Sequence, residues 1–449
     1  MNDANYATRL ESRVADRPDA VALRRPAPGS AHDTATWTHA HLHERAARAA
    51  AVLAELGVAP GDRVLVRAAT SFDTVATYLG VLRAGAVHMP VNPAYTPAEV
   101  AAFVDDADPA LLIVRPEDVD ALTPVAGGRR LVTLAGGPDG EFDARVDDAD
   151  PAPPVARDGD DPAALLFTSG TTGRAKGAVI THANLTHNGL ALCGAWGFTG
   201  DDVVLHVLPL FHVHGLFVAL GCALLAGATT ILCPRFDLDT TIANLPRATV
   251  MMGVPTHWTR LLADPRFDRE TTANLRLCTS GSAPLPAPVW RRIAERTGHE
   301  IVERYGMTET GIITSNPLDG ERVPGTVGFP LTGQEVRVTG PDATVLGPGE
   351  VGIVETRGPH VCAGYWRRPE AWAAVTRPDG WFVTGDVGHL DAEGRLTLEG
   401  RAGDMIISGG YNVYPTEVEL VVDALPGVVE SAVVGLPHPD LGEGVAAVV

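Results

Sequence analysis

Cysteine is scarce in this chain of 449 residues, and the few cysteines are not arranged in pairs. None belongs to a Cys-x-x-Cys motif, and an odd number cannot all form disulfides within one molecule. A small secreted protein held together by disulfides shows an even, regularly spaced set. We therefore expect a reducing, cytoplasmic location. The cysteines are Cys193, Cys222, Cys233, Cys278 and Cys362.

Positive charge is also in short supply. The chain has 35 Lys and Arg residues against 55 Asp and Glu residues, which gives a formal net charge of −20. A surface of this sign repels a phosphate backbone, so we do not expect nucleic acid as a partner. It repels free nucleotides as well, and a nucleotide site in this chain therefore needs local positive charge or a metal ion.

A long uninterrupted hydrophobic run is missing. The first 13 residues lack the basic-then-apolar pattern of a secretion signal. The most apolar stretch, residues 207–233, is interrupted by polar residues, proline and glycine, which predicts a buried helix and strand rather than a membrane span. No membrane partner is expected. The interruptions are Pro209, His212, His214, Gly215, Gly221 and Gly227.

An amphipathic helix, a glycine-containing turn and a short apolar strand follow one another repeatedly. Segments 41–68, 74–91 and 98–114 have this order, and segments 223–233 and 245–255 show its second half again. Alternating helices and short apolar strands are typical of parallel sheets that helices cover on both faces. The first part of the chain is therefore predicted to be α/β, with more than one sheet.

The pattern changes at two places. The acidic, Pro- and Gly-rich stretch 136–162 is expected to be an exposed loop. From about Val336, short β runs separated by Gly and Asp predict a distorted β-barrel or a small antiparallel sheet. After Arg401 a helix and strand pattern returns, so we place a domain boundary near residue 400. This gives a large domain of residues 1–399 and a small α+β domain that begins at residue 400 and reaches residue 449.

The strongest chemical signal is LLFTSGTTGRAKGAV at residues 165–179. An apolar strand leads into a loop of small residues, whose backbone N–H groups, hydroxyls and one ammonium group can converge on a polyphosphate. The loop is not a Walker A motif, because Ala175 and Gly177 flank the lysine. A flexible linker is the alternative, and the apolar segments on both sides disfavour it. The expected phosphate-binding residues are Thr168, Ser169, Gly170, Thr171, Thr172, Gly173 and Lys176.

Five further segments follow the loop in a fixed order. They are PLFHVHG (209–215), SGSAPL (280–285), ERYGMTET (303–310), FVTGD (382–386) and GRAGDMIISGGYNVYPTEVE (400–419). With the loop, they resemble the ordered signatures of the adenylate-forming superfamily of acyl-CoA synthetases, adenylation domains and luciferases. The resemblance covers essentially the whole chain. It implies an acid–thiol ligase that uses ATP and Mg²⁺ to make an acyl-AMP and then transfers the acyl group to coenzyme A.

The same resemblance implies a role for individual residues. Glu309 and Thr168 are expected to hold Mg²⁺, and Thr308 to donate a hydrogen bond to the α-phosphate. Lys176 is expected to act in catalysis, and His212 to separate the adenylate site from the thiol site and to contact the acid. The residues expected to bind the nucleotide are Gly281, Ser282, Ala283, Tyr305, Gly306, Asp386 and Arg401, and Met307 is expected to contact the acid.

Each of these residues, taken singly, also has a structural alternative. Glu309 could be a surface carboxylate, Asp386 a turn residue and Arg401 part of an ion pair between domains. His212 and His214 could point the same way on an extended segment and hold zinc. No Cys, Asp or Glu cluster lies near them in the sequence, so zinc is disfavoured, and a core position for His214 stays open.

The acid is the least determined part of the prediction. Segments 252–262, 275–285 and 303–328 are most similar to malonyl-CoA synthetases, which points to malonate or methylmalonate. A dicarboxylate needs a second, cationic anchor, because burying an unpaired carboxylate is costly. Arg276 and Arg260 are the candidate anchors, with Arg276 preferred. A short monocarboxylate or an aromatic acid stays open as the substrate.

Two features depart from the superfamily pattern. Residues 420–449 contain no lysine, although the superfamily places a catalytic lysine late in its small domain, so the small domain is expected to be incomplete here. Gly403 also stands where the superfamily has Asp or Lys at the hinge between domains. A nucleotide-binding protein without turnover therefore stays open as an alternative, as does an acceptor other than coenzyme A. The sequence does not indicate the oligomeric state.

Overall fold

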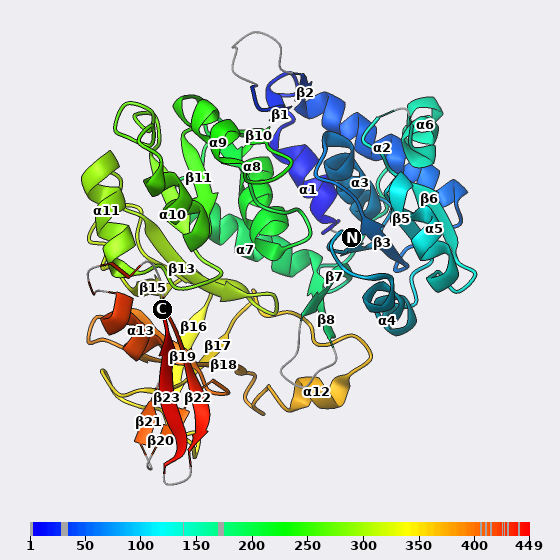
Figure 1. Ribbon diagram of the computed structural model, residues 1–449. Coiled ribbons are helices and arrows are strands. Elements are labelled where there is room, and N and C mark those ends of the chain that lie inside the picture. Colours follow the sequence, from blue (N-terminus) through cyan, green and yellow to red (C-terminus); the bar gives the residue numbers. More distant parts are fainter. Residues whose placement is uncertain are drawn as a thin grey trace.

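We describe a computed structural model of the chain, with no ligand or partner. The residues described are 3–27, 35–137, 139–168, 175–404, 406–408, 411–413, 415–423, 425, 427–428, 431–438 and 441–449. Within these residues, no helix combines the length and the apolar character that crossing a membrane requires. The architecture is mixed α/β, with three sheets and their covering helices (Figure 1).

The six-stranded sheet is built by the first part of the chain, in the order β6-β5-β3-β4-β7-β8. Its strands pair in parallel except for the last pair, β7 and β8, which is antiparallel. This last pair brackets the predicted phosphate loop. The strands are β3 (Arg63–Arg67), β4 (Val87–Pro90), β5 (Leu111–Val114), β6 (Arg130–Thr133), β7 (Pro162–Thr168) and β8 (Lys176–Thr181).

The thirteen-stranded sheet has a parallel half and an antiparallel half. Strands β1, β10, β9, β11, β12 and β13 pair in parallel, and from β13 onward the strands β14, β15, β19, β18, β17 and β16 pair antiparallel. Strand β2 adds an antiparallel edge beside β1. The strands are β1 (Val21–Arg24), β2 (Thr36–Thr38), β9 (Val203–His206), β10 (Thr229–Leu232), β11 (Val250–Gly253), β12 (Leu277–Ser280), β13 (Val302–Met307), β14 (Gly311–Ser315), β15 (Thr326–Pro330), β16 (Glu335–Thr339), β17 (Gly352–Arg357), β18 (Phe382–Leu390) and β19 (Leu396–Arg401).

The third sheet is formed near the C-terminus, in the order β21-β20-β23-β22 (Figure 1, lower left). It consists of β20 (Ile406–Ser408), β21 (Tyr411–Val413), β22 (Ala432–His438) and β23 (Gly442–Val448), with helix α13 (Pro415–Asp423) between β21 and β22. This is the helix and strand pattern expected after Arg401. The boundary that we place near residue 400 stays a prediction.

The remaining helices follow the strands closely. Several begin at a Ser, Thr or Asp whose side chain accepts a hydrogen bond from a backbone N–H of the first turn. They are α1 (Tyr6–Arg13), α2 (His39–Glu55), α3 (Phe72–Arg83), α4 (Pro97–Ala107), α5 (Val119–Leu122), α6 (Glu141–Asp148), α7 (His182–Ala195), α8 (Gly221–Ala226), α9 (Leu238–Asn244), α10 (Pro255–Ala263), α11 (Ala287–Thr297) and α12 (Pro369–Ala373), the 3-10 turns η1 (Pro116–Asp118), η2 (Thr123–Val125) and η4 (Leu245–Arg247), and the π-helix η3 (His214–Leu220).

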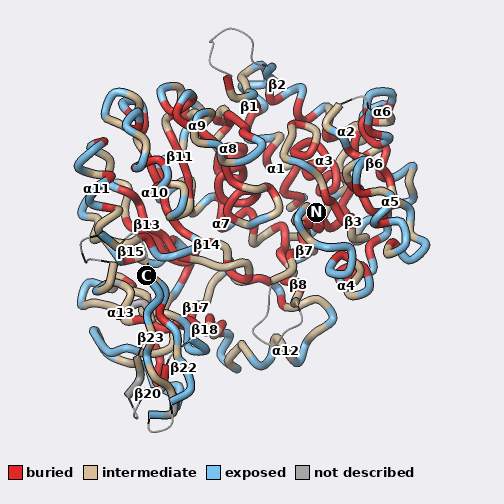
Figure 2. Tube along the Cα trace, in the orientation of Figure 1, coloured by how far each residue is buried: buried red, intermediate tan, exposed pale blue. Residues whose placement is uncertain are grey.

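Most of the buried residues lie around the two larger sheets (Figure 2). Small residues allow the helices there to approach closely. A Cβ atom added to Gly80 in α3 would lie 2.6 Å from the Cβ atom of Ala49 in α2, which is too close for two side chains. The alanine-rich face of α2 and Gly80 therefore set the distance between these helices.

The predicted α/β class and the repeated helix–strand order are confirmed, and the apolar stretch 207–233 folds as η3, α8 and β10. One local prediction is wrong. Residues 136–162 are not all loop, because residues 141–148 form α6. Phe142 and Val146 lie one helical turn apart and are both buried against Val132 and Leu134. The high content of Asp, Gly and Pro around them concealed this apolar pair.

Glu303 is a buried carboxyl group in β13, the strand where the large sheet changes from parallel to antiparallel pairing. Its Oε1 accepts a hydrogen bond of 2.9 Å from the backbone N–H of Gly325. Burial raises the pKa of Glu303 to about 8, from an ordinary value of 4.5. Between these two pH values the folded protein keeps a proton that the unfolded chain has lost, so the free energy of unfolding falls as the pH rises.

Replacing Glu303 by Gln should reduce this pH dependence. Between pH 5 and pH 8 the wild type should lose on the order of 2–4 kcal/mol more free energy of unfolding than the Glu303→Gln variant. Urea denaturation at both pH values measures the difference. The exposed Glu300 provides a control, and Glu300→Gln should follow the wild type. Equal pH dependence of Glu303→Gln and the wild type would contradict the assignment.

Candidate active site

The candidate site lies where the parallel strands of the large sheet end. Residues 207–214, 254–257 and 281–283 directly follow β9, β11 and β12, and Thr308 and Glu309 follow β13. Because these strands are parallel, their carboxyl ends meet at one edge of the sheet. This edge is where ligands bind in open α/β sheets.

The β13–β14 hairpin places Thr308 and Glu309, and close backbone contacts fix its shape. A Cβ atom added to Gly306 would lie 2.0 Å from the carbonyl oxygen of Gly311, so no side chain fits there. The side chain of Asn188 in α7 forms two hydrogen bonds with the backbone of the next residue, Ile312. Its Oδ1 accepts from the N–H of Ile312 at 3.2 Å, and its Nδ2 donates to the carbonyl of Ile312 at 2.9 Å.

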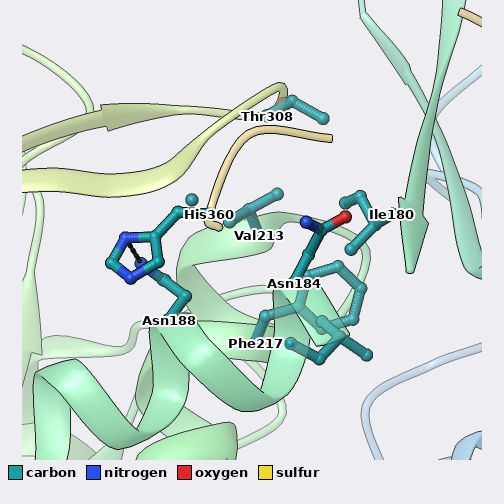
Figure 3. Close-up of a pocket in the computed structure, with 9 residues that line it drawn as sticks. Ile180, Asn184, Asn188, Val213, Phe217, Thr308 and His360 are labelled. Carbon is teal, nitrogen blue, oxygen red and sulfur yellow. Dashed lines mark hydrogen bonds between the residues drawn. The ribbon is translucent and has the colours of Figure 1, made fainter. Parts of the chain in front are cut away.

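A cavity lies between this hairpin and α7 (Figure 3). Thr308 borders it from the hairpin, Ile180 from β8 and Val213 from the segment that follows β9. On its floor, Nδ2 of Asn188 and Nδ1 of His360 lie 3.0 Å apart. Thr308 therefore faces a space that joins the strand of Lys176 to the predicted histidine segment.

The side chains expected around the phosphates come together at the ends of β7 and β8. Thr168 and Lys176 are paired in the register of these strands. Oγ1 of Thr168 lies 3.4 Å from Oε1 of Glu309, although 141 residues separate them in the sequence. Lys176 is the only lysine in the sequence, so no other lysine side chain can take its place. Ser169, Gly170, Thr171, Thr172 and Gly173 lie outside the described residues.

The side chains expected around the nucleoside form a second group. The hydroxyl of Tyr305 donates to Oδ2 of Asp386 at 2.5 Å, and Nε of Arg401 lies 3.2 Å from Oδ1 of the same carboxylate. Burial raises the pKa of Asp386, and the contacts with Tyr305 and Arg401 oppose this rise. Asp386 and Arg401 face each other across β18 and β19. The antiparallel half of the sheet thus delivers this carboxylate to the end of β13.

The turn after β12 brings Gly281, Ser282 and Ala283 to the same edge. Ser282 has a φ of 70°, a conformation that residues other than glycine seldom adopt outside functional turns. Ser282 and Ala283 are exposed, whereas Gly281 is buried. This conformation turns the backbone sharply beside β13.

The segment that bears the histidines enters the π-helix η3 at His214. Nε2 of His206 donates to the carbonyl of Gly215 at 2.8 Å, which satisfies one backbone group of this irregular turn. His214 is buried, and its Nδ1 lies 3.3 Å from Oγ of Ser282. Burial, with the nearby Arg304 and histidines, holds the pKa of His214 well below its ordinary value. His212 reaches solvent, and partial desolvation lowers its pKa.

Arg304 is the site residue that the sequence analysis missed. It is 4% exposed, and its Nε and Nη2 have no hydrogen-bond partner among the described residues. A Cβ atom added to Gly281 would lie 2.4 Å from Cζ of Arg304, so the glycine makes room for the guanidinium group. Burial lowers the pKa of Arg304 to about 10, and the group is still charged at neutral pH.

Further polar atoms around Arg304 are buried without a partner in the described part of the chain. They are Nε2 of His214, Nδ1 of His257 and Oγ of Ser280. After burial, Arg304 and His257 are among the groups that lower the pKa of His214, because the three side chains lie in one neighbourhood. A buried charge and several unsatisfied polar atoms in one place are typical of a site that binds a polar ligand.

Arg276, the preferred anchor in the sequence analysis, is engaged elsewhere. Its guanidinium forms two hydrogen bonds with Asp202, at 2.7 and 2.6 Å, and a third with the carbonyl of Trp196 at 2.8 Å. Arg276 also precedes β12, whereas Gly281 follows this strand at its other end. We therefore correct this prediction, since the geometry is that of a structural ion pair. Arg260 lies exposed on α10, one turn after His257.

Comparison with known proteins agrees with this geometry. The family described as AMP-binding enzyme matches residues 10–366. The chain belongs to this family. The match covers the elements that carry the candidate site up to Trp366, and it confirms the resemblance to adenylate-forming enzymes.

Relatives within the AMP-binding enzyme family act on different acids. A feruloyl-CoA synthase of Amycolatopsis sp is 38% identical over 437 residues, covering 96% of this chain and 86% of that protein. A mitochondrial malonate–CoA ligase, ACSF3 of Bos taurus, is 34% identical over 492 residues, covering 98% and 83%. The crystal structure of ATP-bound MatB from Rhodopseudomonas palustris is 45% identical, with a TM-score of 0.95, and covers 99% of this chain and 88% of that chain.

The structural role of the ion pair between Arg276 and Asp202 can be tested by substitution. Arg276→Met leaves the carboxylate of Asp202, which is 3% exposed, without its cation, so the variant should lose about 2–4 kcal/mol of free energy of unfolding. Arg266→Met, which removes an ion pair with Asp264 on the surface, should lose less. Urea denaturation measures both. A selective loss of dicarboxylate use at unchanged stability would restore Arg276 as the anchor.

Proposed function

We propose that this protein is an AMP-forming acyl-CoA synthetase. The carboxylate of an acid attacks the α-phosphorus of ATP, which forms acyl-AMP and releases pyrophosphate, and the thiolate of coenzyme A then displaces AMP. The membership in the AMP-binding enzyme family supports this reaction, as do two CoA-ligating relatives. So does the gathering of phosphate-side and nucleoside-side residues at one sheet edge.

The phosphate side has the donors that a magnesium ion prefers. Glu309 offers a carboxylate and Thr168 a hydroxyl, both hard oxygen ligands. Bound there, Mg²⁺ would neutralise phosphate charge and assist the departure of pyrophosphate. Lys176 adds positive charge at the start of β8, which counters the repulsion between an acidic chain and a polyphosphate, and Thr308 donates to the α-phosphate from the hairpin.

The nucleoside side positions the sugar and the base. Asp386 accepts hydrogen bonds from the ribose hydroxyls, and Arg401 keeps its carboxylate in place. The base lies between Tyr305 and the turn of Gly281, Ser282 and Ala283, next to the backbone of Gly306. His212 stands between the adenylate and the approaching thiol, and Met307 contacts the acid. These roles follow the family pattern, and the contacts of Asp386 with Tyr305 and Arg401 support the sugar site.

For the acid, we propose malonate or a close relative such as methylmalonate. The observation that carries this choice is the buried guanidinium of Arg304, with Nε and Nη2 unpaired among the described residues. A buried charge without a partner is destabilising, and a second carboxylate on the substrate would satisfy it with two parallel hydrogen bonds. A monocarboxylate would leave it unpaired. The malonate–CoA ligase relative supports the same choice.

An aromatic acid is the second candidate. A feruloyl-CoA synthase is as similar in sequence as the malonate ligase, and the ring of Phe236 stacks on His257 at 4.2 Å with an interplanar angle of 5°. A flat wall of this kind suits an aromatic ring. Pyrophosphate release with malonate, methylmalonate, acetate, benzoate and ferulate distinguishes the candidates. If ATP binds and no acid releases pyrophosphate, the protein is a nucleotide-binding protein without turnover.

Arg304→Met tests the anchor directly. The variant should lose about 100-fold in kcat/KM for malonate and far less for acetate, because only malonate has a second carboxylate to pair with the guanidinium. It should fold at least as stably as the wild type, since it removes an unpaired buried charge. Arg260→Met is the control for the other candidate arginine. Equal losses for malonate and acetate in Arg304→Met would refute the anchor role.

Asp386→Asn tests the ribose contact. The variant keeps the shape of the side chain and an acceptor for Tyr305, but it loses the charge that strengthens hydrogen bonds to hydroxyl groups. Its dissociation constant for ATP should rise roughly 10-fold. Isothermal titration calorimetry measures it, with Asp379→Asn on the surface as control. Unchanged nucleotide affinity would remove Asp386 from the site.

A further inference from the structure

Residues 359–366 lie across two elements of the candidate site. The N–H of Ala363 donates to the carbonyl of Val179, and the N–H of Val179 donates to the carbonyl of Gly364, both at 2.9 Å. The segment thus adds to the edge of β8, the strand that begins at Lys176. The N–H of Cys362 donates to the carbonyl of Glu309 at 2.7 Å. One short segment therefore ties the phosphate strand to the hairpin.

The side chain of Tyr365 also connects the strand of Lys176 with the hairpin of Glu309. Its hydroxyl donates to Oε1 of Glu309 at 2.9 Å, and Nζ of Lys176 lies 5.3 Å from the centre of its ring. The ring also packs in an aromatic cluster, because it makes a T-shaped contact with Trp372, with the ring centroids 5.4 Å apart, and Trp372 stacks on Phe382. Tyr365 is half-buried, and burial together with Glu309 raises the pKa of its hydroxyl, which therefore stays protonated as a donor.

We propose that Tyr365 is a positioning residue that orients the carboxylate of Glu309 toward the metal ion of ATP, an inference that rests on the proposed function of Glu309. Glu309 is held at its backbone by Cys362 and at Oε1 by Tyr365 and Thr168. Among the described residues, neither side-chain contact uses Oε2. The carboxylate therefore has one oxygen fixed by the protein and one oxygen to offer to a cation.

This arrangement reduces the cost of binding the metal. A glutamate side chain has three rotatable bonds, and a free carboxylate must be ordered when the metal binds. A hydroxyl that already fixes the carboxylate removes part of this cost, and residues that orient metal ligands typically change metal affinity by 10–100-fold. The ring of Tyr365 has a separate role, since it contacts Lys176 and Trp372. Tyr365→Phe therefore removes the hydroxyl and keeps these ring contacts.

The experiment measures metal and ATP binding without turnover. Binding of ATP is followed by calorimetry in EDTA and over a range of Mg²⁺ concentrations, and Mn²⁺ binding to the ATP complex by electron paramagnetic resonance. Tyr365→Phe should raise roughly 10-fold the metal concentration at which the metal's effect on ATP binding is half-maximal. It should leave the affinity for ATP in EDTA unchanged. Tyr78→Phe is the matched control, because it also removes a buried hydroxyl but one without a hydrogen-bond partner in the described residues. It should behave like the wild type.

Glu309→Gln separates the inference from the proposed function. If Glu309→Gln weakens metal binding and Tyr365→Phe does not, the positioning role is wrong while the proposed role of Glu309 stands. If neither variant changes metal binding, the proposed role of Glu309 is wrong, and the inference about Tyr365 is wrong with it. The inference is also wrong if Tyr365→Phe weakens ATP binding in EDTA as much as it does with Mg²⁺, since the hydroxyl would then be a structural contact.

Discussion

The β13–β14 hairpin is the constraint on which the rest of the site depends. Here the thirteen-stranded sheet changes from parallel to antiparallel pairing, and the chain reverses with the backbone of Gly306 almost against that of Gly311. A hydrogen bond from Asn188 connects the returning strand β14 to α7. A hydrogen bond from the N–H of Cys362 connects the turn to the segment beside β8. The parallel half supplies the binding edge, and the antiparallel half carries Asp386 to it. Any change that opened the hairpin would separate the proposed phosphate side from the proposed nucleoside side.

Few positively charged side chains lie at the candidate site. The chain is strongly acidic and holds a single lysine, yet three cations lie at the candidate site. Lys176 begins β8, directly after the predicted phosphate loop in the sequence, Arg401 is paired with Asp386, and Arg304 is buried and unpaired within the described residues. Each has a different chemical task in the proposed reaction. We propose that Arg304 engages a substrate carboxylate, because it is buried without an ion-pair partner among the described residues, unlike the arginines that form ion pairs elsewhere.

Much of the fold and of the site could be predicted from the sequence. The order of helices and strands followed from the spacing of apolar residues, and the site segments followed from six ordered motifs whose members are neighbours in the chain. The helix α6 was missed because Phe142 and Val146 stand among acidic and turn-forming residues. Arg304 was missed although it lies inside the motif ERYGMTET, because a basic residue between Glu303 and Tyr305 looks like part of an exposed strand until its burial is known.

By itself, the sequence determined the α/β class and the family, since these depend on local periodicity and on contiguous motifs. It also supplied the candidate residues of the proposed phosphate and nucleoside sides. Only the tertiary structure distinguished the two arginines Arg276 and Arg304, and the proposal that Arg304 binds the acid rests on this difference. Arg276 finds its carboxylate 74 positions away in Asp202, whereas Arg304 is buried beside a glycine and finds none among the described residues. Likewise, Tyr365 and Glu309 meet across 56 positions. Partners so distant in the chain are set by the packing of whole elements, which a local pattern does not contain.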